Sequence, residues 1–103
     1  MKTLIKILKF AGEFAENKDV AKKLRLEKIM PSLSKGHQIV VDFEGMSGAT
    51  QSFVHALISD PIRKYKDIAF ENLLYKNANN DIKGIILIVY RYMQESLNGE
   101  IEQ

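Results

Sequence analysis

Three side chains in this sequence could take part in acid–base or metal chemistry: His37, Asp42 and Glu44. The two carboxylates lie two positions apart in a segment that reads as extended, where alternate side chains point to the same side. Such a pair could share a proton or hold a divalent cation, and with His37 it would form a small hydrolytic site. No further ligand stands at a spacing that would complete a metal site. We therefore expect no catalytic residue, metal or cofactor, and expect Asp42 to bond the backbone amides that follow it.

Hydroxyl groups follow this strand end at Ser47, Thr50 and Ser52. Thr50 is a good N-cap for a helix that begins at Gln51, and this places Ser52 in the first turn. A phosphate on Ser52 would meet free backbone N–H groups and the positive end of the helix dipole. It would also add about two negative charges to an exposed corner. The alternatives are that Ser52 satisfies a backbone N–H or faces water, that Thr50 is a plain cap, and that Ser47 is an ordinary loop serine.

The first elements that must position these residues are a strand and a helix. Residues 3–9 alternate lysine with aliphatic residues, which favours a strand with one exposed side. Asn17 or Asp19 can cap the helix that follows. We expect Pro31 to break this helix, because proline has no backbone N–H to donate, and we expect Gly36 to end the segment.

The middle of the chain predicts the strand and helix that carry the candidate residues. The β-branched run within residues 37–43 is typical of a central strand buried on both faces. A loop of residues 45–48 follows, and then a helix with its apolar residues turned inward: Phe53, Ala56, Leu57 and Ile58. We expect Asp60-Pro61 to stop this helix, with Asp60 capping one further short turn.

The last third of the chain predicts one more strand and the clearest amphipathic helix. Residues 67–76 read as the third strand, and residues 77–81 supply turn and cap residues. A set of mostly apolar residues then recurs every three or four positions until Asn98-Gly99, where we expect the helix to end: Ile82, Ile85, Ile86, Val89, Tyr92 or Met93, Ser96 and Leu97. The alternation of strands and helices predicts an α/β fold, with a mixed, partly parallel sheet of about three to four strands packed against about three helices. We expect residues 1–103 to form a single domain.

Composition and charge argue against a disulfide-linked or membrane-spanning protein. The chain is 46% hydrophobic, has no cysteine, and carries a net charge of +2 from basic and acidic residues mixed along its length. Its longest apolar run, Ile85–Tyr90, is far shorter than the roughly 20 residues that cross a membrane, so we expect a cytoplasmic protein. The first helix carries one dense group of basic residues: Lys22, Lys23, Arg25 and Lys28. This group supports the alternative of a nucleic-acid-associated regulator, although we expect it to be a helix face exposed to solvent.

The second strand and the helix after it carry a recognisable pattern. Ile39-Val-Val-Asp-Phe-Glu-Gly-Met46, followed by Thr50-Gln-Ser-Phe53, resembles the STAS-like domain of unknown function found in bacteria and phages. Lys18-Asp-Val-Ala21 and Asn77-Ala-Asn-Asn-Asp-Ile-Lys83 are similar to two further stretches of that family, so the resemblance runs from about residue 3 to residue 97. The chain departs from the family pattern at Lys18, where arginine is usual, and at Val54-His55, where Ala-Asp is usual.

The resemblance implies a domain similar to anti-sigma factor antagonists. Those proteins bind a histidine-kinase-like ATPase, and some are switched by phosphorylation of a serine at the start of the second helix. Aligning the two patterns at Asp42 brings Ser52 close to that position, although Thr50-Gln51-Ser52-Phe53 replaces the Asp-Ser-Ser-Gly of the true antagonists. The implied partner-binding residues lie on the 45–50 loop, directly before it, and on the helix from Thr50: Glu44, Ser47, Thr50, Gln51, Ser52 and His55. A homodimer is a further expectation if the Tyr90 and Met93 side of the last helix is exposed.

Overall fold

The computed structural model describes the backbone of residues 2–102 and the side chains of residues 2–95. Three strands form a parallel sheet in the order β1-β3-β5: β1 (Lys2–Lys6), β3 (Gln38–Asp42) and β5 (Leu73–Lys76). Two very short strands, β2 (Phe14–Ala15) and β4 (Gly48–Ala49), pair in parallel beside it. The α/β fold predicted from the sequence is confirmed, and within the described residues every strand pair is parallel.

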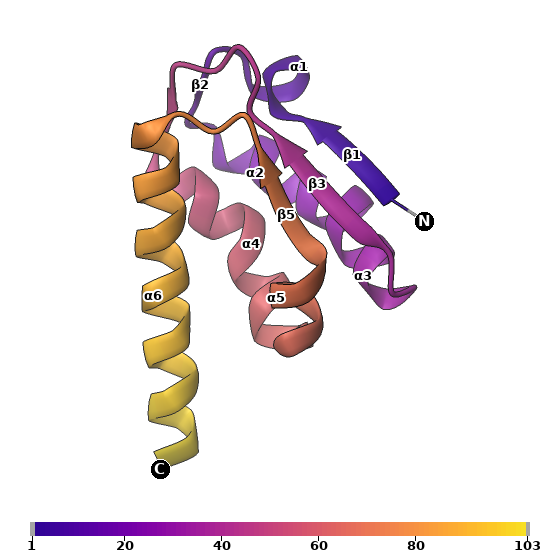
Figure 1. Ribbon diagram of the computed structural model, residues 1–103, viewed down its shortest axis with the longest axis vertical. Coiled ribbons are helices and arrows are strands. Elements are labelled where there is room, and N and C mark those ends of the chain that lie inside the picture. The colour runs from indigo at the N-terminus through magenta and orange to yellow at the C-terminus, as the bar shows by residue number, and fades with distance from the viewer. Residues whose placement is uncertain (1, 103) are drawn as a thin grey trace.

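Helical segments connect the strands, and a last helix follows β5: α1 (Ile7–Ala11), α2 (Lys18–Leu24), the π-helical turn η1 (Arg25–Ile29), α3 (Met30–Ser34), α4 (Gln51–Tyr65), α5 (Asp67–Asn72) and the last helix α6 (Asn80–Glu102). Figure 1 shows β1, β3 and β5 in front, with α2, α3 and α4 behind them and α6 along one side. The core fills the space between the sheet and these helices, and Ile39, Val41 and Phe53 are among its fully buried side chains.

The first strand is shorter than residues 3–9, because α1 takes up the second half of that stretch. The register of the sheet pairs Lys6 with Asp42, the last residue of β3. The pairing of β1 with β3 stops there, and from Ile7 the chain turns into α1. Gly12 ends this turn with a φ of +76°, and its N–H donates to the Leu8 carbonyl.

The prediction of a break at Pro31 is wrong, because the chain stays helical from α2 through η1 into α3. The N–H of Met30 donates to the carbonyl of Arg25, five residues earlier. This wider turn just before Pro31 makes room for a ring that would otherwise clash with the preceding carbonyls. Gly36 ends the segment as predicted: its φ is +73°, and its N–H and that of His37 bond back to α3.

Two further predictions about the middle of the chain are wrong. α4 continues through Pro61 to Tyr65, and the ring of Pro61 is buried. Leu57, Ile58 and Ile62 are buried on the same face of the helix, and this apolar packing outweighs one lost backbone hydrogen bond.

The predicted third strand, residues 67–76, is a strand only from Leu73 onward, because residues 67–72 form α5. The backbone turns sharply at Lys66, where φ is +49°, and a new helix begins directly after it.

α6 begins as the sequence predicts. The side chain of Asn79 accepts a hydrogen bond from the Ile82 N–H at 2.9 Å, which caps the first turn. The predicted inward residues are buried or half-buried, and at the position left open between Tyr92 and Met93 it is Met93 that faces the core. The helix continues past Asn98-Gly99, and the side chains of Ser96 and Leu97 lie outside the described residues.

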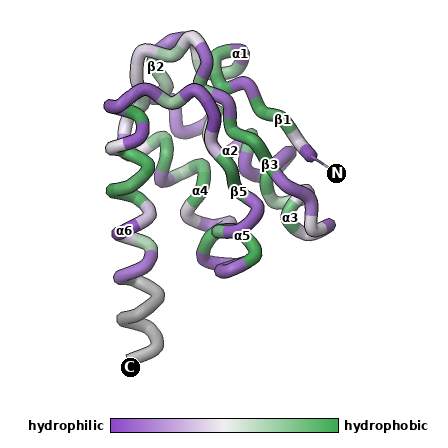
Figure 2. The backbone as a smooth tube through the Cα atoms, in the orientation of Figure 1, coloured by the Kyte–Doolittle hydropathy of each residue, from purple (hydrophilic) through white to green (hydrophobic). Residues whose placement is uncertain are grey.

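Hydropathy follows this architecture. Figure 2 shows hydrophobic segments in β1, β3 and β5 and in stretches of α4 and α6. In the part of the chain that the structure describes, no helix combines the length and the hydrophobicity that a membrane span requires.

Candidate functional site

Asp42 is a structural carboxylate at the end of β3. It is 3% exposed, and its Oδ1 accepts hydrogen bonds from the Asn77 side chain and from the Glu44 backbone N–H, both at 2.9 Å. These two bonds, with smaller contributions from Lys76 and Lys6, hold the pKa of Asp42 below its ordinary value despite the cost of burial. Asp42 therefore fastens the end of β3 to the turn after β5, and its predicted bond to a following amide is confirmed.

The hydrolytic site suggested by the sequence is not assembled. β3 ends at Asp42, so Glu44 lies in a turn and not on the extended strand that the pairing assumed. His37 precedes the opposite end of β3. Glu44 is exposed, and it borders a hollow of about 220 Å³ together with Asp42, Lys6 and Lys9. Among the described residues, no three His, Asp or Glu side chains gather closely enough to hold a metal ion.

The loop that leads to α4 is fastened on both sides. The backbone N–H and the hydroxyl of Ser47 both donate to the Glu13 carbonyl, at 2.8 and 3.1 Å. The Asn79 side chain donates to the Ser47 carbonyl at 3.0 Å. Met46 and Ala49 are buried on either side. These contacts fix the position at which α4 begins.

The first turn of α4 is capped but open to solvent. The hydroxyl of Thr50 accepts a hydrogen bond from the Phe53 N–H at 3.0 Å, so Thr50 is the N-cap that the sequence predicts. Phe53 is fully buried and anchors the turn in the core. Gln51 and Ser52 are exposed at the two positions between them. Thr50 bonds one of the amides in this turn, and the first amides of a helix have no acceptor within the helix itself.

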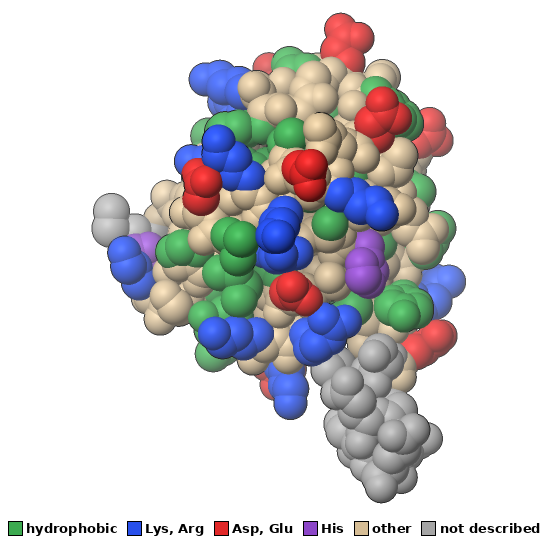
Figure 3. All heavy atoms as spheres, turned by 180° about the vertical axis from the view of Figure 1, so that it is seen from behind, with side chains coloured by type: hydrophobic (Ala, Val, Ile, Leu, Met, Phe, Trp, Pro, Cys, Tyr) green, Lys and Arg blue, Asp and Glu red, His purple; other side chains and the backbone are tan. Residues whose placement is uncertain are grey.

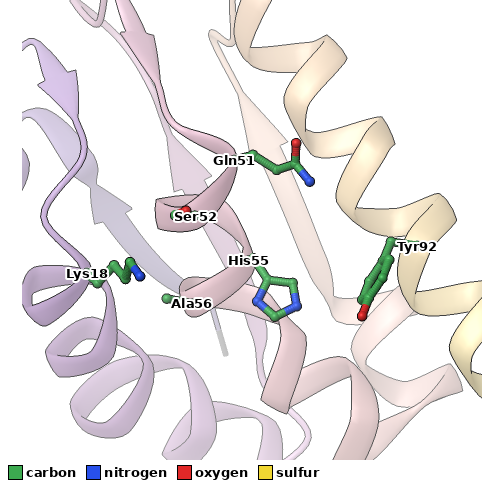
Figure 4. A pocket seen from close by; sticks show the side chains of 6 residues that line it. All are labelled: Lys18, Gln51, Ser52, His55, Ala56 and Tyr92. Carbon is green, nitrogen blue, oxygen red and sulfur yellow. The ribbon is translucent and has the colours of Figure 1, made fainter.

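A cavity of about 270 Å³ opens beside this turn, and its lining comes from three helices: Lys18, Gln51, Ser52, His55, Ala56 and Tyr92. Figure 4 shows Lys18 on α2, the four residues of α4 in the middle, and Tyr92 on α6 facing His55. The rings of His55 and Tyr92 meet edge to face, with their centroids 5.8 Å apart. Tyr92 is 56% exposed. The cavity thus combines an amine, an amide, a hydroxyl, an imidazole and a phenol on an accessible surface.

The structure brings together three of the six predicted partner-binding residues: Gln51, Ser52 and His55. Thr50 lies next to them as the helix cap, whereas the side chain of Ser47 is bonded to the Glu13 carbonyl. Glu44 belongs to the other hollow, at the end of β3. Tyr92 was not among the predicted partner-binding residues, because the sequence left open whether it faces inward on the last helix. An aromatic residue on the outer side of an amphipathic helix is a usable signal of a binding surface.

The basic group on the first helix is partly used within the fold. Arg25 donates to the Ala56 carbonyl at 2.8 Å and lies 3.5 Å from the Asp60 carboxylate. The amine of Lys28 lies over the ring of Phe10, 5.6 Å from its centroid. Lys22 and Lys23 are exposed. Figure 3 shows this side of the molecule, where Lys and Arg side chains alternate with acidic and apolar ones and do not form a continuous basic surface.

The side of α6 considered for a homodimer packs inward. Met93 is fully buried, and the hydroxyl of Tyr90 bonds that of Tyr75 at 2.8 Å. Burial raises the pKa of both phenols. The condition on which the homodimer rested is therefore not met. Among the side chains of α6 that the structure describes, residues 80–95, the exposed large apolar ones are Leu87, Ile88 and Tyr92.

Comparison with families of known proteins gives one match. A family model described as a STAS-like domain of unknown function matches residues 20–83, which is more than half of the chain. The match includes the strand-end motif around Asp42 and the helix start at Thr50–Phe53. Lys18 lies just outside it. The searches of curated proteins and of solved structures gave no match.

Proposed function

The chain belongs to the family of STAS-like domains of unknown function, and from this premise we propose that it is a protein-interaction module with no catalytic site of its own. It docks a partner protein through the 45–50 loop and the first turn of α4. The observation that carries this proposal is the exposed pair Gln51 and Ser52, which borders a cavity with His55 on a turn that hydrogen bonds hold in place. A fixed, accessible turn loses little conformational entropy when a partner binds.

Phosphorylation of Ser52 is the proposed switch of this surface. The hydroxyl is exposed in the first helical turn, where backbone amides and the helix dipole stabilise added negative charge. Lys18 lines the same cavity and can pair with a phosphate. The modification would place about two negative charges on a surface fitted to the unmodified residue, and so would release the partner. The similarity to anti-sigma factor antagonists favours a histidine-kinase-like ATPase as both partner and modifying enzyme.

Site-specific photocrosslinking tests the docking surface. A photoreactive amino acid at Gln51, in the full chain expressed in its source organism, is expected to trap one defined protein. The same group at Lys64, exposed near the other end of α4, serves as the matched control and is expected not to trap it. Adding Ser52→Glu to the Gln51 probe is expected to abolish the crosslink. Trapping of the same protein at both positions with equal yield would show that the proposed surface is wrong.

Phosphorylation is tested with the trapped protein itself. The purified partner and ATP are expected to phosphorylate the wild-type chain and Thr50→Ser, but not Ser52→Ala. Incorporation that is equal in wild type and Ser52→Ala would place the modification elsewhere. A partner that binds at Gln51 without phosphorylating the chain would leave the docking surface standing and remove the switch.

A further inference from the structure

One face of the three-stranded sheet has no covering layer among the described residues. α2, α3 and α4 lie on the opposite side and α6 runs along one side, so that Figure 1 looks onto the strands. Exposure along β1 alternates accordingly: Leu4 is 51% exposed, whereas its neighbour Ile5 is 1% exposed. Parallel sheets usually have both faces covered, because their strands are apolar on both sides. An open parallel sheet therefore marks a surface that another element can cover.

The register of the strands places an apolar strip across the middle of this face. Leu4 pairs with Val40, and Val40 pairs with Leu74. Leu74 is 38% exposed and Val40 is half-buried. With neighbouring strands about 4.8 Å apart, the strip is about 10 Å long. Seven residues of an α-helix rise by about the same length, so positions i, i+3 or i+4, and i+7 of a helix laid across the strands can each meet one of these side chains.

Positive charge borders the strip on both sides. The next row across the sheet, at the carboxyl ends of the strands, is Lys6, Asp42 and Lys76, and the row at the other end contains Lys2. The Asp42 carboxylate is buried and bonded to Asn77 and Glu44, whereas the three lysines are exposed. A helix that matches this face must carry acidic residues on both sides of its apolar stripe. A second copy of the same face would set lysine against lysine, which disfavours face-to-face self-association.

We propose that the open face of the sheet is a second docking surface, which takes an amphipathic helix with acidic flanks from a partner protein. The apolar stripe of that helix covers Leu4, Val40 and Leu74, and its carboxylates pair with Lys2, Lys6 and Lys76. This surface is made by the strands, whereas the cavity beside α4 is lined by residues of α2, α4 and α6 and shares no residue with it. The two surfaces can therefore be occupied independently.

A nuclear magnetic resonance titration of the full chain tests the proposal with two synthetic helical peptides of about 18 residues. Both carry the same leucine stripe, flanked by glutamates in one peptide and by lysines in the other. The acidic peptide is expected to shift amide resonances of β1, β3 and β5 with saturation, and the basic peptide is expected to leave them unchanged. The affinity is expected to fall as salt is added, because exposed charge pairs are screened.

Variants separate the open sheet face from the rest of the surface. Leu4→Glu/Leu74→Glu is expected to weaken binding of the acidic peptide by about tenfold or more. The matched control, Leu26→Glu/Leu87→Glu, changes two leucines that are 53% and 61% exposed elsewhere, and is expected to bind as wild type does. Ser52→Glu/His55→Glu is also expected to bind normally, because it changes only the α4 surface. If Leu4→Glu/Leu74→Glu does not fold, the charge reversal Lys2→Glu/Lys76→Glu is expected to transfer the preference to the basic peptide.

Three results would overturn the proposal. The first is an acidic peptide that leaves the strand resonances unshifted. The second is equal binding of the acidic and basic peptides, which would show no role for the lysines. The third is a wild-type dimer in sedimentation equilibrium that Leu4→Glu/Leu74→Glu converts to a monomer, because the occupant would then be a second copy of the chain.

Discussion

Asp42 and Ser52 both lie at the end of a secondary-structure element in the same motif, yet the fold uses them in opposite ways. Asp42 is buried, and two donors within the chain bond its Oδ1. Ser52 is exposed at the edge of a cavity, while its neighbour Thr50 caps the helix. A polar group that is saturated within the chain serves the fold, whereas a polar group held at a fixed, open position is available to a partner. Substitutions at Asp42 should therefore lower the stability of the fold, whereas substitutions at Ser52 should change the binding of a partner.

The largest loss of stability in this comparison is expected for Asp42→Ala. This change removes the buried carboxylate that accepts from the Asn77 amide and the Glu44 N–H, and hydrogen bonds to a charged group contribute more to stability than neutral ones. Thermal unfolding should show a lower midpoint than for any substitution at Thr50 or Ser52. In a double-mutant cycle, Asn77→Gly, which tolerates the φ of +59° at this position, should add little once Asp42 is alanine, because the two side chains act through one bond. Additive losses would show that Asp42 does not stabilise the fold through Asn77.

The stabilising effect of the Asp42 charge should depend on pH. The folded-state pKa of Asp42 lies below its ordinary value of 3.8, because the Asn77 and Glu44 donors favour the carboxylate. Its contribution is therefore complete above pH 3.8 and is lost as the pH falls through the folded-state pKa. Denaturant unfolding of wild type and Asp42→Asn should show a gap in midpoint at neutral pH that narrows in acid. A constant gap over this range would contradict the assignment.

Removal of the helix cap should have an intermediate effect. Thr50→Ala deletes the acceptor of the Phe53 N–H and should lower the free energy of unfolding by about 1 kcal/mol. For a domain of this size, such a change lowers the melting temperature by roughly 4–8 °C. Thr50→Ser keeps the hydroxyl and is the matched control, which should stay close to wild type. A loss as large as that of Thr50→Ala in the serine variant would assign the effect to packing of the threonine methyl group.

The smallest effects on stability are expected at Ser52. Ser52→Ala should change the free energy of unfolding by less than about 0.5 kcal/mol, as exposed positions usually do. Ser52→Glu should be neutral or stabilising by about 0.3–1 kcal/mol, because it adds negative charge at the N-terminus of α4. Chemical denaturation of both variants measures this directly. A clear destabilisation by either change would mean that the fold uses this hydroxyl.

The sequence predicted correctly those features of the fold that depend on residues close together in the chain. The cap at Thr50, the bond from Asp42 to the Glu44 amide and the inward side of α6 were all predicted, because each depends on residues within a few positions of one another. The predicted strand at residues 37–43 was also correct to within one residue at each end.

The failures concern elements that tertiary packing decides. Both prolines lie within helical segments, Pro31 behind a widened turn and Pro61 on a buried apolar face. Residues 67–72 have apolar positions compatible with a strand or a helix, and they form a helix after the sharp turn at Lys66. The candidate site was found only in part, because the neighbours of Ser52 come from helices far apart in sequence. Spacing alone could not show that Lys18 and Tyr92 line the same cavity.

Affinity for the crosslinked partner tests the central claim most directly, when measured by calorimetric titration against wild type, Ser52→Glu and Asp42→Asn. We predict that Ser52→Glu weakens binding by about tenfold or more while it keeps full stability. We predict that Asp42→Asn, at a temperature where it remains folded, binds as tightly as wild type. The opposite result, with binding lost in folded Asp42→Asn and unchanged in Ser52→Glu, would contradict the assignment of the α4 surface to the partner and of Asp42 to the fold.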